Sequence, residues 1–166
     1  MASNTRRTAA ADAELLVLGP TARRPHALPP LPAGVSPALI AHVVADGLGL
    51  QPLVVDLGCP LAPAVPHLRL AAAAGPARCL SGGNAMDRRR VEALLAEGRR
   101  WGARLARRQP HRPLLLAECV PGGTTTALAL LCGLGVEARG LVSGSLLRPV
   151  HGLKAGLVAR GLAAAG

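Results

Sequence analysis

One stretch, residues 114–131, constrains the fold more than any other part of this sequence. It predicts a short apolar strand at 114–116, a tight turn, and a helix that opens with threonine; the turn and helix start are Pro121, Gly122, Gly123, Thr124, Thr125 and Thr126. Glycine permits the positive φ angles and close backbone approach that such a turn needs. A strand, a turn and a helix in this order are typical of parallel α/β proteins, so we predict that class.

The glycine turn also raises the question of a ligand. A helix that begins there presents free N–H groups and the positive end of its dipole, which suits a phosphate or a carboxylate. An ordinary strand–helix connection has the same pattern, and the turn lacks both the P-loop lysine and the dinucleotide G-x-G-x-x-G. Glu118 favours the ligand-binding interpretation, because a carboxylate beside a glycine turn packs poorly but can orient a substrate.

The rest of the chain predicts further strands and helices around this unit. We expect strands at 14–18, 52–56 and 141–143, helices at 36–47, 87–108 and 150–164, and a frayed lead-in at 1–11. The helix at 36–47 has a good N-cap in Ser36 and a suitable first residue in Pro37. On the long helix, the residues expected to face inward are Val91, Leu94, Leu95, Trp101 and Leu105.

These elements predict one α/β domain over residues 1–166, with helices flanking a parallel sheet in three Rossmann-like layers. Asp56 would end the second strand, where ligands bind in open α/β sheets. The same position also suits a carboxylate that only hydrogen-bonds its own loop. The sequence leaves both interpretations of Asp56 open.

Composition excludes several classes of function. The net charge is +10, but aromatic residues are only 1% and the arginines are dispersed, so we predict no nucleic-acid partner. Four cysteines without a C-x-x-C pair predict no metal site, no cofactor and reduced thiols in the cytoplasm. No stretch of bilayer-spanning length is free of charge and proline, so we predict no membrane segment.

Residues 118–128, Glu-Cys-Val-Pro-Gly-Gly-Thr-Thr-Thr-Ala-Leu, resemble a signature of the nicotinate-nucleotide–dimethylbenzimidazole phosphoribosyltransferase family, in its cobalamin-synthesis branch. Other segments resemble that branch in the same order. They are residues 12–14 with 19–20, 28–34, 36–37, 76–79, and 142–145 followed by His151 and Lys154. The similarity therefore covers nearly the whole chain.

The resemblance implies a glycosyltransferase that moves phosphoribose from nicotinate mononucleotide to dimethylbenzimidazole or a similar purine- or benzimidazole-like base. It implies that Glu118 helps orient the sugar or base and that Lys154 neutralises phosphate. The other residues implied for the phosphate and ribose region are Gly122, Gly123, Thr124, Thr125, Thr126, Ser143 and Ser145. Such a transfer needs phosphate clamps and a carboxylate near a developing cation.

The chain departs from that family in length. Family members are longer, and the glutamate that serves as their general base lies farther toward the C-terminus, without a counterpart here. No catalytic residue is therefore assigned. We expect a fragment that does not turn over alone, with a homodimer or a complementing C-terminal half as partner. The alternative, from another class, is a non-catalytic module that binds a phosphorylated ligand.

Overall fold

A computed structural model describes residues 2–31, 34–72, 74–144 and 146–166. Along the chain the elements are α1 (Ala2–Leu18), α2 (Pro37–Gly47), β1 (Val54–Asp56), β2 (His67–Arg69), a short 3₁₀ helix η1 (Leu80–Gly82), α3 (Arg88–Arg108), α4 (Gly123–Gly133) and α5 (His151–Ala165). Strands β1 and β2 pair in parallel, with Val54 opposite His67. The mixed α/β class is confirmed.

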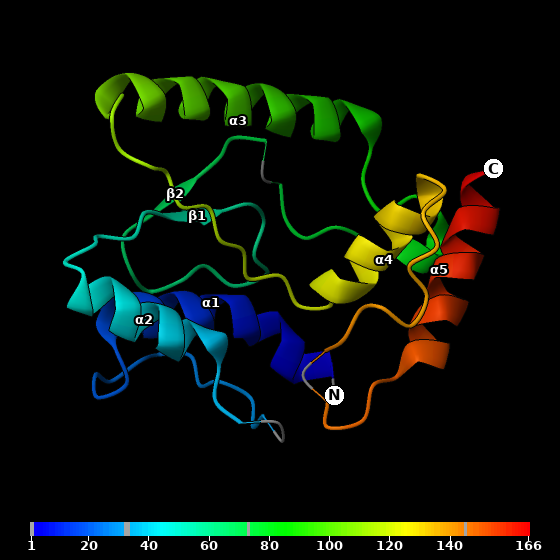
Figure 1. Ribbon diagram of the computed structural model, residues 1–166, viewed down its shortest axis with the longest axis horizontal. Coiled ribbons are helices and arrows are strands. Elements are labelled where there is room, and N and C mark those ends of the chain that lie inside the picture. Colours follow the sequence, from blue (N-terminus) through cyan, green and yellow to red (C-terminus); the bar gives the residue numbers. More distant parts are fainter. Residues whose placement is uncertain (1, 32–33, 73, 145) are drawn as a thin grey trace.

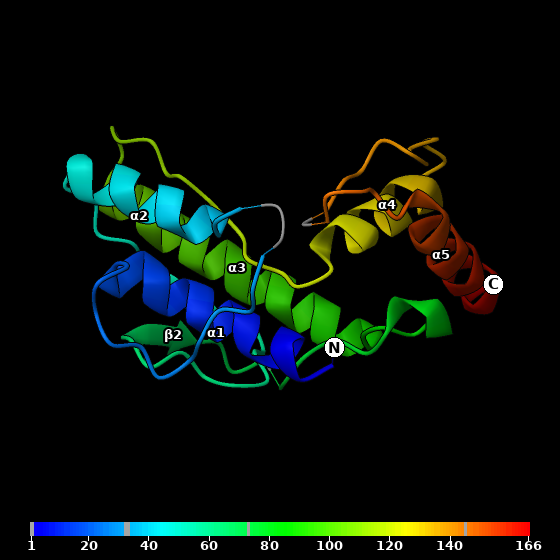
Figure 2. The same ribbon diagram turned by 90° about the horizontal axis from the view of Figure 1, so that it is seen from below.

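The elements form two groups (Figure 1). Helix α1 packs against α2 along one edge of the first group, α3 runs along the opposite edge, and β1 and β2 lie between them. The second group contains α4 and α5, which pack against each other, and η1, which packs against α5. Figure 2 shows the second group beside one end of the first. This arrangement leaves room for a site where the two groups meet.

The second group holds a small aliphatic core. Leu128 of α4, Ala138 and Val158 of α5 are at most 2% exposed. Helix α5 comes unusually close to η1 at Gly161, where an added Cβ would lie 2.5 Å from the carbonyl oxygen of Leu80. A glycine is therefore required at this contact, because any side chain would collide with backbone.

The first group also buries apolar residues of α1, namely Ala10, Ala11 and Leu15, and buried carboxylates of the same helix bind its loops. Glu14 is fully buried and accepts hydrogen bonds from the backbone N–H groups of His26 (3.1 Å) and Ala64 (2.9 Å). Its other contact is with His26 Nδ1 at 2.6 Å. Burial alone would raise the pKa of Glu14, but these hydrogen bonds hold it below its usual value. One side chain thus fastens two long loops to α1.

Two predictions for the N-terminal region are wrong. Residues 14–18 are not a strand, and residues 2–11 are not a frayed lead-in, because both belong to the single helix α1. The alanines that precede Glu14 are strong helix formers, and a run of 17 residues favours a helix over a short strand. The helix at 37–47 is confirmed: Ser36 Oγ accepts from the N–H of Ala38 at 3.1 Å, and Pro37 is first.

Two further strands are absent from the described part of the chain. Residues 114–116 and 141–143 are irregular, and the leucines at 114, 115 and 116 are 55%, 78% and 86% exposed. A strand needs a neighbour to pair with, and these segments have none here. Helix α3 is confirmed over 88–108, but none of its residues is buried; Val91 is 40% and Leu95 is 59% exposed. Of the residues predicted to face inward, Leu94, Trp101 and Leu105 are half-buried along one face of the helix, whereas the prediction is wrong for Val91 and Leu95.

Candidate functional site

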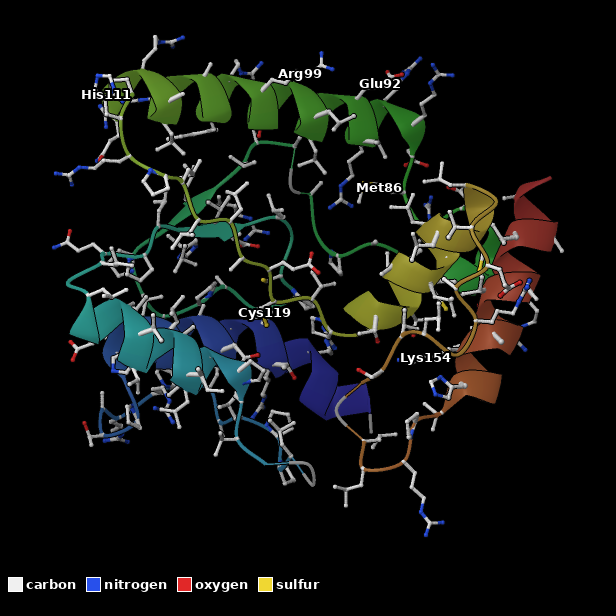
Figure 3. All side chains as sticks on the ribbon, in the orientation of Figure 1. Met86, Glu92, Arg99, His111, Cys119 and Lys154 are labelled. Carbon is white, nitrogen blue, oxygen red and sulfur yellow. The ribbon has the colours of Figure 1, made fainter. Side chains whose placement is uncertain are left out.

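A cleft of about 700 Å³ lies between the two groups. Its walls come from α1, the start of α2, β1, residues 117–125 and the start of α5. In Figure 3, Cys119 lies on the α1–α2 side and Lys154 on the α4–α5 side. Most of the residues predicted for the site thus line one cleft, although three separate segments supply them.

Lys154 is the only lysine in the sequence, and it is buried, with 7% of its surface exposed. It lies in the first turn of α5, and its Nζ donates to Thr124 Oγ1 at 2.8 Å and to the carbonyl of Ser143. An added Cβ at Gly144 would come within 3.3 Å of this Nζ, so the loop passes close to the ammonium group. Among the described residues no carboxylate pairs with Lys154, so its charge is offset only by neutral oxygens.

The N-terminus of α4 faces the same end of the cleft. Gly122 takes the left-handed conformation with φ of 78° and precedes the first helical residue, Gly123. The threonines at 124–126 form the first turn of this helix together with Gly123, and no side chain within the described ranges caps it. Thr124 and Thr125 line the cleft. The positive end of the α4 dipole therefore adds to the charge of Lys154.

The remaining predicted residues do not all line the cleft. Glu118 lines the cleft, with Oε1 3.8 Å from the position that a Cβ on Gly123 would occupy. Thr126 is exposed outside the cleft wall, and Ser143 takes part only through its carbonyl. Ser145 lies outside the described residues. The geometry thus joins Glu118, the glycine turn, two threonines and Lys154.

The opposite end of the cleft contains a buried carboxylate that sequence reasoning did not select. Asp12 of α1 accepts from Ser36 Oγ at 2.5 Å and from Cys119 Sγ at 2.9 Å. Burial and the neighbouring Asp12 carboxylate raise the pKa of Cys119 to about 12, so its thiol stays protonated near neutral pH. A signal was present in the sequence, since acidic residues are scarce and two of the nine stand at 12 and 14.

Asp56, at the end of β1, also lines the cleft and is 1% exposed. Its Oδ1 accepts from the N–H groups of Gly58 (2.8 Å) and Cys59 (2.6 Å). Burial would raise the pKa of Asp56, but these hydrogen bonds and Arg69 lower it below the usual value. Its Oδ2 lies 3.7 Å from Arg69 Nε and accepts no hydrogen bond from the described residues. The loop-bonding interpretation of Asp56 is confirmed for one oxygen, and the other retains acceptor capacity.

Two features are absent from the described residues. These residues contain no group of three or more histidine, cysteine, aspartate or glutamate side chains placed to hold a metal ion. They also contain no helix long and apolar enough to cross a membrane. The site is a mostly apolar cleft in a mixed α/β protein, with a cation at one end and carboxylates at the other.

Comparison with known proteins adds named relatives. No protein-family model matches the chain. It is 57% identical over 162 residues to a UPF0284 protein of Parasynechococcus marenigrum and 54% identical over 159 residues to one of Prochlorococcus marinus. A UPF0284 protein of Synechocystis is 45% identical over 155 residues. These matches cover 97%, 95% and 93% of this chain but only 40%, 38% and 42% of the relatives.

The comparison corrects the family resemblance drawn from the sequence. The matching cyanobacterial proteins are named UPF0284, and their names do not place them among the nicotinate-nucleotide–dimethylbenzimidazole phosphoribosyltransferases. The assignment to that family is therefore wrong on this evidence. The chain spans about 40% of the length of the first relatives that it matches. The function of the site has to be argued from its own geometry.

Proposed function

We propose that this chain binds the phosphate of a phosphorylated ribosyl ligand at the Lys154 end of the cleft. One observation carries the proposal: Lys154 is a buried cation with no carboxylate partner among the residues described, and it lies beside the uncapped start of α4. A buried charge without a counter-ion is costly. A phosphate in the cleft would offset that cost and accept from the Lys154 ammonium and from the N–H of Thr124, because the N–H groups of Gly123 and Thr125 already donate to backbone carbonyls.

The other end of the cleft suits the sugar or base of the same ligand. Asp12 and Asp56 line it, while Glu118 lies beside the glycine turn, and carboxylates accept hydrogen bonds from ribose hydroxyls and from ring or amino N–H groups. A ligand with an anionic group at one end and donors at the other matches this polarity. The cleft volume is also within the range of small-molecule sites. Nicotinate mononucleotide is such a ligand, and we propose it as the first to test.

For the longer protein we propose phosphoribosyl transfer from nicotinate mononucleotide to a nitrogenous base. Such a transfer needs a phosphate clamp and a carboxylate near the ribose carbon as positive charge develops there. Lys154 would supply the clamp and Glu118 the carboxylate. We also propose that the complete sheet is Rossmann-like with helices on both sides, and that the protein acts in the cytoplasm.

The single lysine allows a direct test. In protein labelled with ¹³C only at lysine, Lys154 gives the one side-chain Cε signal, which titration with nicotinate mononucleotide or inorganic phosphate should shift. We expect saturable shifts, and Lys154→Met should remove the heat of binding in calorimetry while the chain stays folded. Methionine keeps the length and apolar stem of lysine, so the variant isolates the charge.

Arg104→Met is the matched control, because Arg104 carries its guanidinium 5.2 Å above the Trp101 ring on α3, away from the cleft. Its binding heat should equal that of the unmodified chain. Equal binding by Lys154→Met, or unchanged lysine signals at saturating nicotinate mononucleotide and phosphate, would reject the phosphate site. Binding of phosphate but not of the nucleotide would keep the anion site and reject the ribosyl ligand.

A further inference from the structure

The segment after α3 presents a strip of bare apolar surface. The leucines at 114, 115 and 116 are 55%, 78% and 86% exposed, and Val120 follows at 53%. These residues enter no sheet, and residues 117–123, which follow them, share the cleft wall with residues 53–56. We call residues 114–116 the leucine strip. Contiguous exposed leucines of this kind mark an interface or an aggregation hazard.

The sheet formed by β1 and β2 is also incomplete. In the described chain β1 and β2 form a two-stranded parallel sheet, and Leu53 and Val55 are 56% and 41% exposed. Parallel sheets are normally covered on both faces, and an isolated pair of strands is marginal in water. The leucine strip thus leads directly into the cleft wall that β1 also lines.

The relatives indicate what covers this surface. This sequence matches them along nearly its whole length, at up to 57% identity, yet fills only about 40% of theirs. In those proteins the same sequence is therefore joined to more polypeptide. The strip contains no charged residue, so an added strand could pair with it through its backbone and bury its leucines without desolvating a charge.

We propose that the leucine strip is a docking strand for the additional polypeptide carried by the longer relatives. When that polypeptide is present, residues 114–116 become a strand of a larger sheet, and Leu115 and Leu116 are buried. This would also fix Glu118 and the glycine turn, which follow directly in the chain and line the cleft. Docking at the strip and completion of the ligand site would therefore be one event.

A chimera tests the proposal. This chain replaces the matching 162 residues of the Parasynechococcus marenigrum protein, and amide hydrogen exchange is compared between the chimera and the isolated chain. We expect the amides of residues 114–119 to exchange roughly 100-fold more slowly in the chimera, as ladder hydrogen bonds protect them. Equal exchange in both proteins would overturn the proposal.

A variant separates docking from folding. Leu115→Asp should leave the melting temperature of the isolated chain unchanged, because the side chain is 78% exposed there, and lower that of the chimera. Leu134→Asp, at a leucine that is 71% exposed after α4, is the control and should affect neither protein. If both variants lower the melting temperature of the chimera equally, the strip is not the docking strand. The isolated chain could instead form a dimer that Leu115→Asp dissociates. If the amides of the strip also exchange fast in the chimera, the strip binds a second copy of the chain and the proposal is overturned.

Discussion

The two groups of elements are stabilised by different means. Around α1, buried Asp12 and Glu14 accept hydrogen bonds from several loops, and these hydrogen bonds fix the loops to the helix. Around α4 and α5, Leu128 and Val158 pack in a small aliphatic core, and Gly161 allows close backbone approach. With 1% aromatic residues the chain lacks large side chains to cover long loops. In the first group, carboxylates that bind loop N–H groups supplement the packing of small apolar residues such as Ala10, Ala11 and Leu15.

The largest loss of stability should come from removing a buried carboxylate of the first group. Glu14→Ala leaves the His26 and Ala64 N–H groups without their acceptor and creates a cavity, so we expect a loss of about 3–5 kcal/mol in the free energy of unfolding. Urea denaturation followed by circular dichroism measures it. Glu92→Ala removes an exposed ion pair with Arg88 and should cost less than about 0.5 kcal/mol. Similar losses in both variants would show that Glu14 is not a structural tie.

Disturbing the contact between α5 and η1 in the second group should give an intermediate loss of stability. Gly161→Ala places a methyl group 2.5 Å from the Leu80 carbonyl oxygen, so α5 has to move away from η1, at a cost of about 1–3 kcal/mol. Gly156→Ala is the control in the same helix, where an added Cβ meets nothing within 4 Å. It should raise stability by about 0.5–1 kcal/mol, because alanine favours helix more than glycine does. Thermal melts of the two variants shifting in the same direction would contradict this account.

The smallest loss of stability is expected when the pH is lowered. The pKa of Asp56 is lower in the folded chain than its ordinary value of 3.8, so ionised Asp56 favours the folded state. That contribution is complete above about pH 4–5 and is lost as pH falls through the folded pKa. Hydrogen exchange should therefore show α1 and β1 losing protection at a higher pH than α4 and α5. Asp56→Asn should flatten this dependence in the first group, and an unchanged pH profile in that variant would contradict the assignment.

The sequence predicted local structure well where local signals suffice. The α2 cap at Ser36, the extent of α3, and the glycine turn before α4 follow from capping, periodicity and glycine conformation. It also predicted that Lys154 and the glycine turn serve one site, and both line the cleft.

Predictions that depend on distant partners failed. The apolar run at 14–18 is ambiguous between strand and helix, and its helical upstream neighbours decide it. Residues 114–116 have strand-forming composition, but pairing depends on chain elsewhere. Asp12 was not predicted as a cleft residue, because its contacts with Ser36 and Cys119 span 24 and 107 residues of sequence. The hydrophobic periodicity of the sequence carries no information about contacts between residues so far apart in the chain.

The hydrogen bond between Cys119 and Asp12 gives the chain a built-in chemical reporter. A thiol with a pKa near 12 is ionised to about one part in ten thousand at pH 8, so alkylating reagents meet almost no thiolate there. Cys79 and Cys119 are both exposed, but the contact with Ser81 lowers the pKa of Cys79, so Cys79 should react first. Separation of the 117–123 segment from α1 would free Cys119 from Asp12 and bring its labelling rate toward that of an ordinary cysteine. The ratio of the two rates therefore measures, in real time and without mutation, how often this wall of the cleft opens.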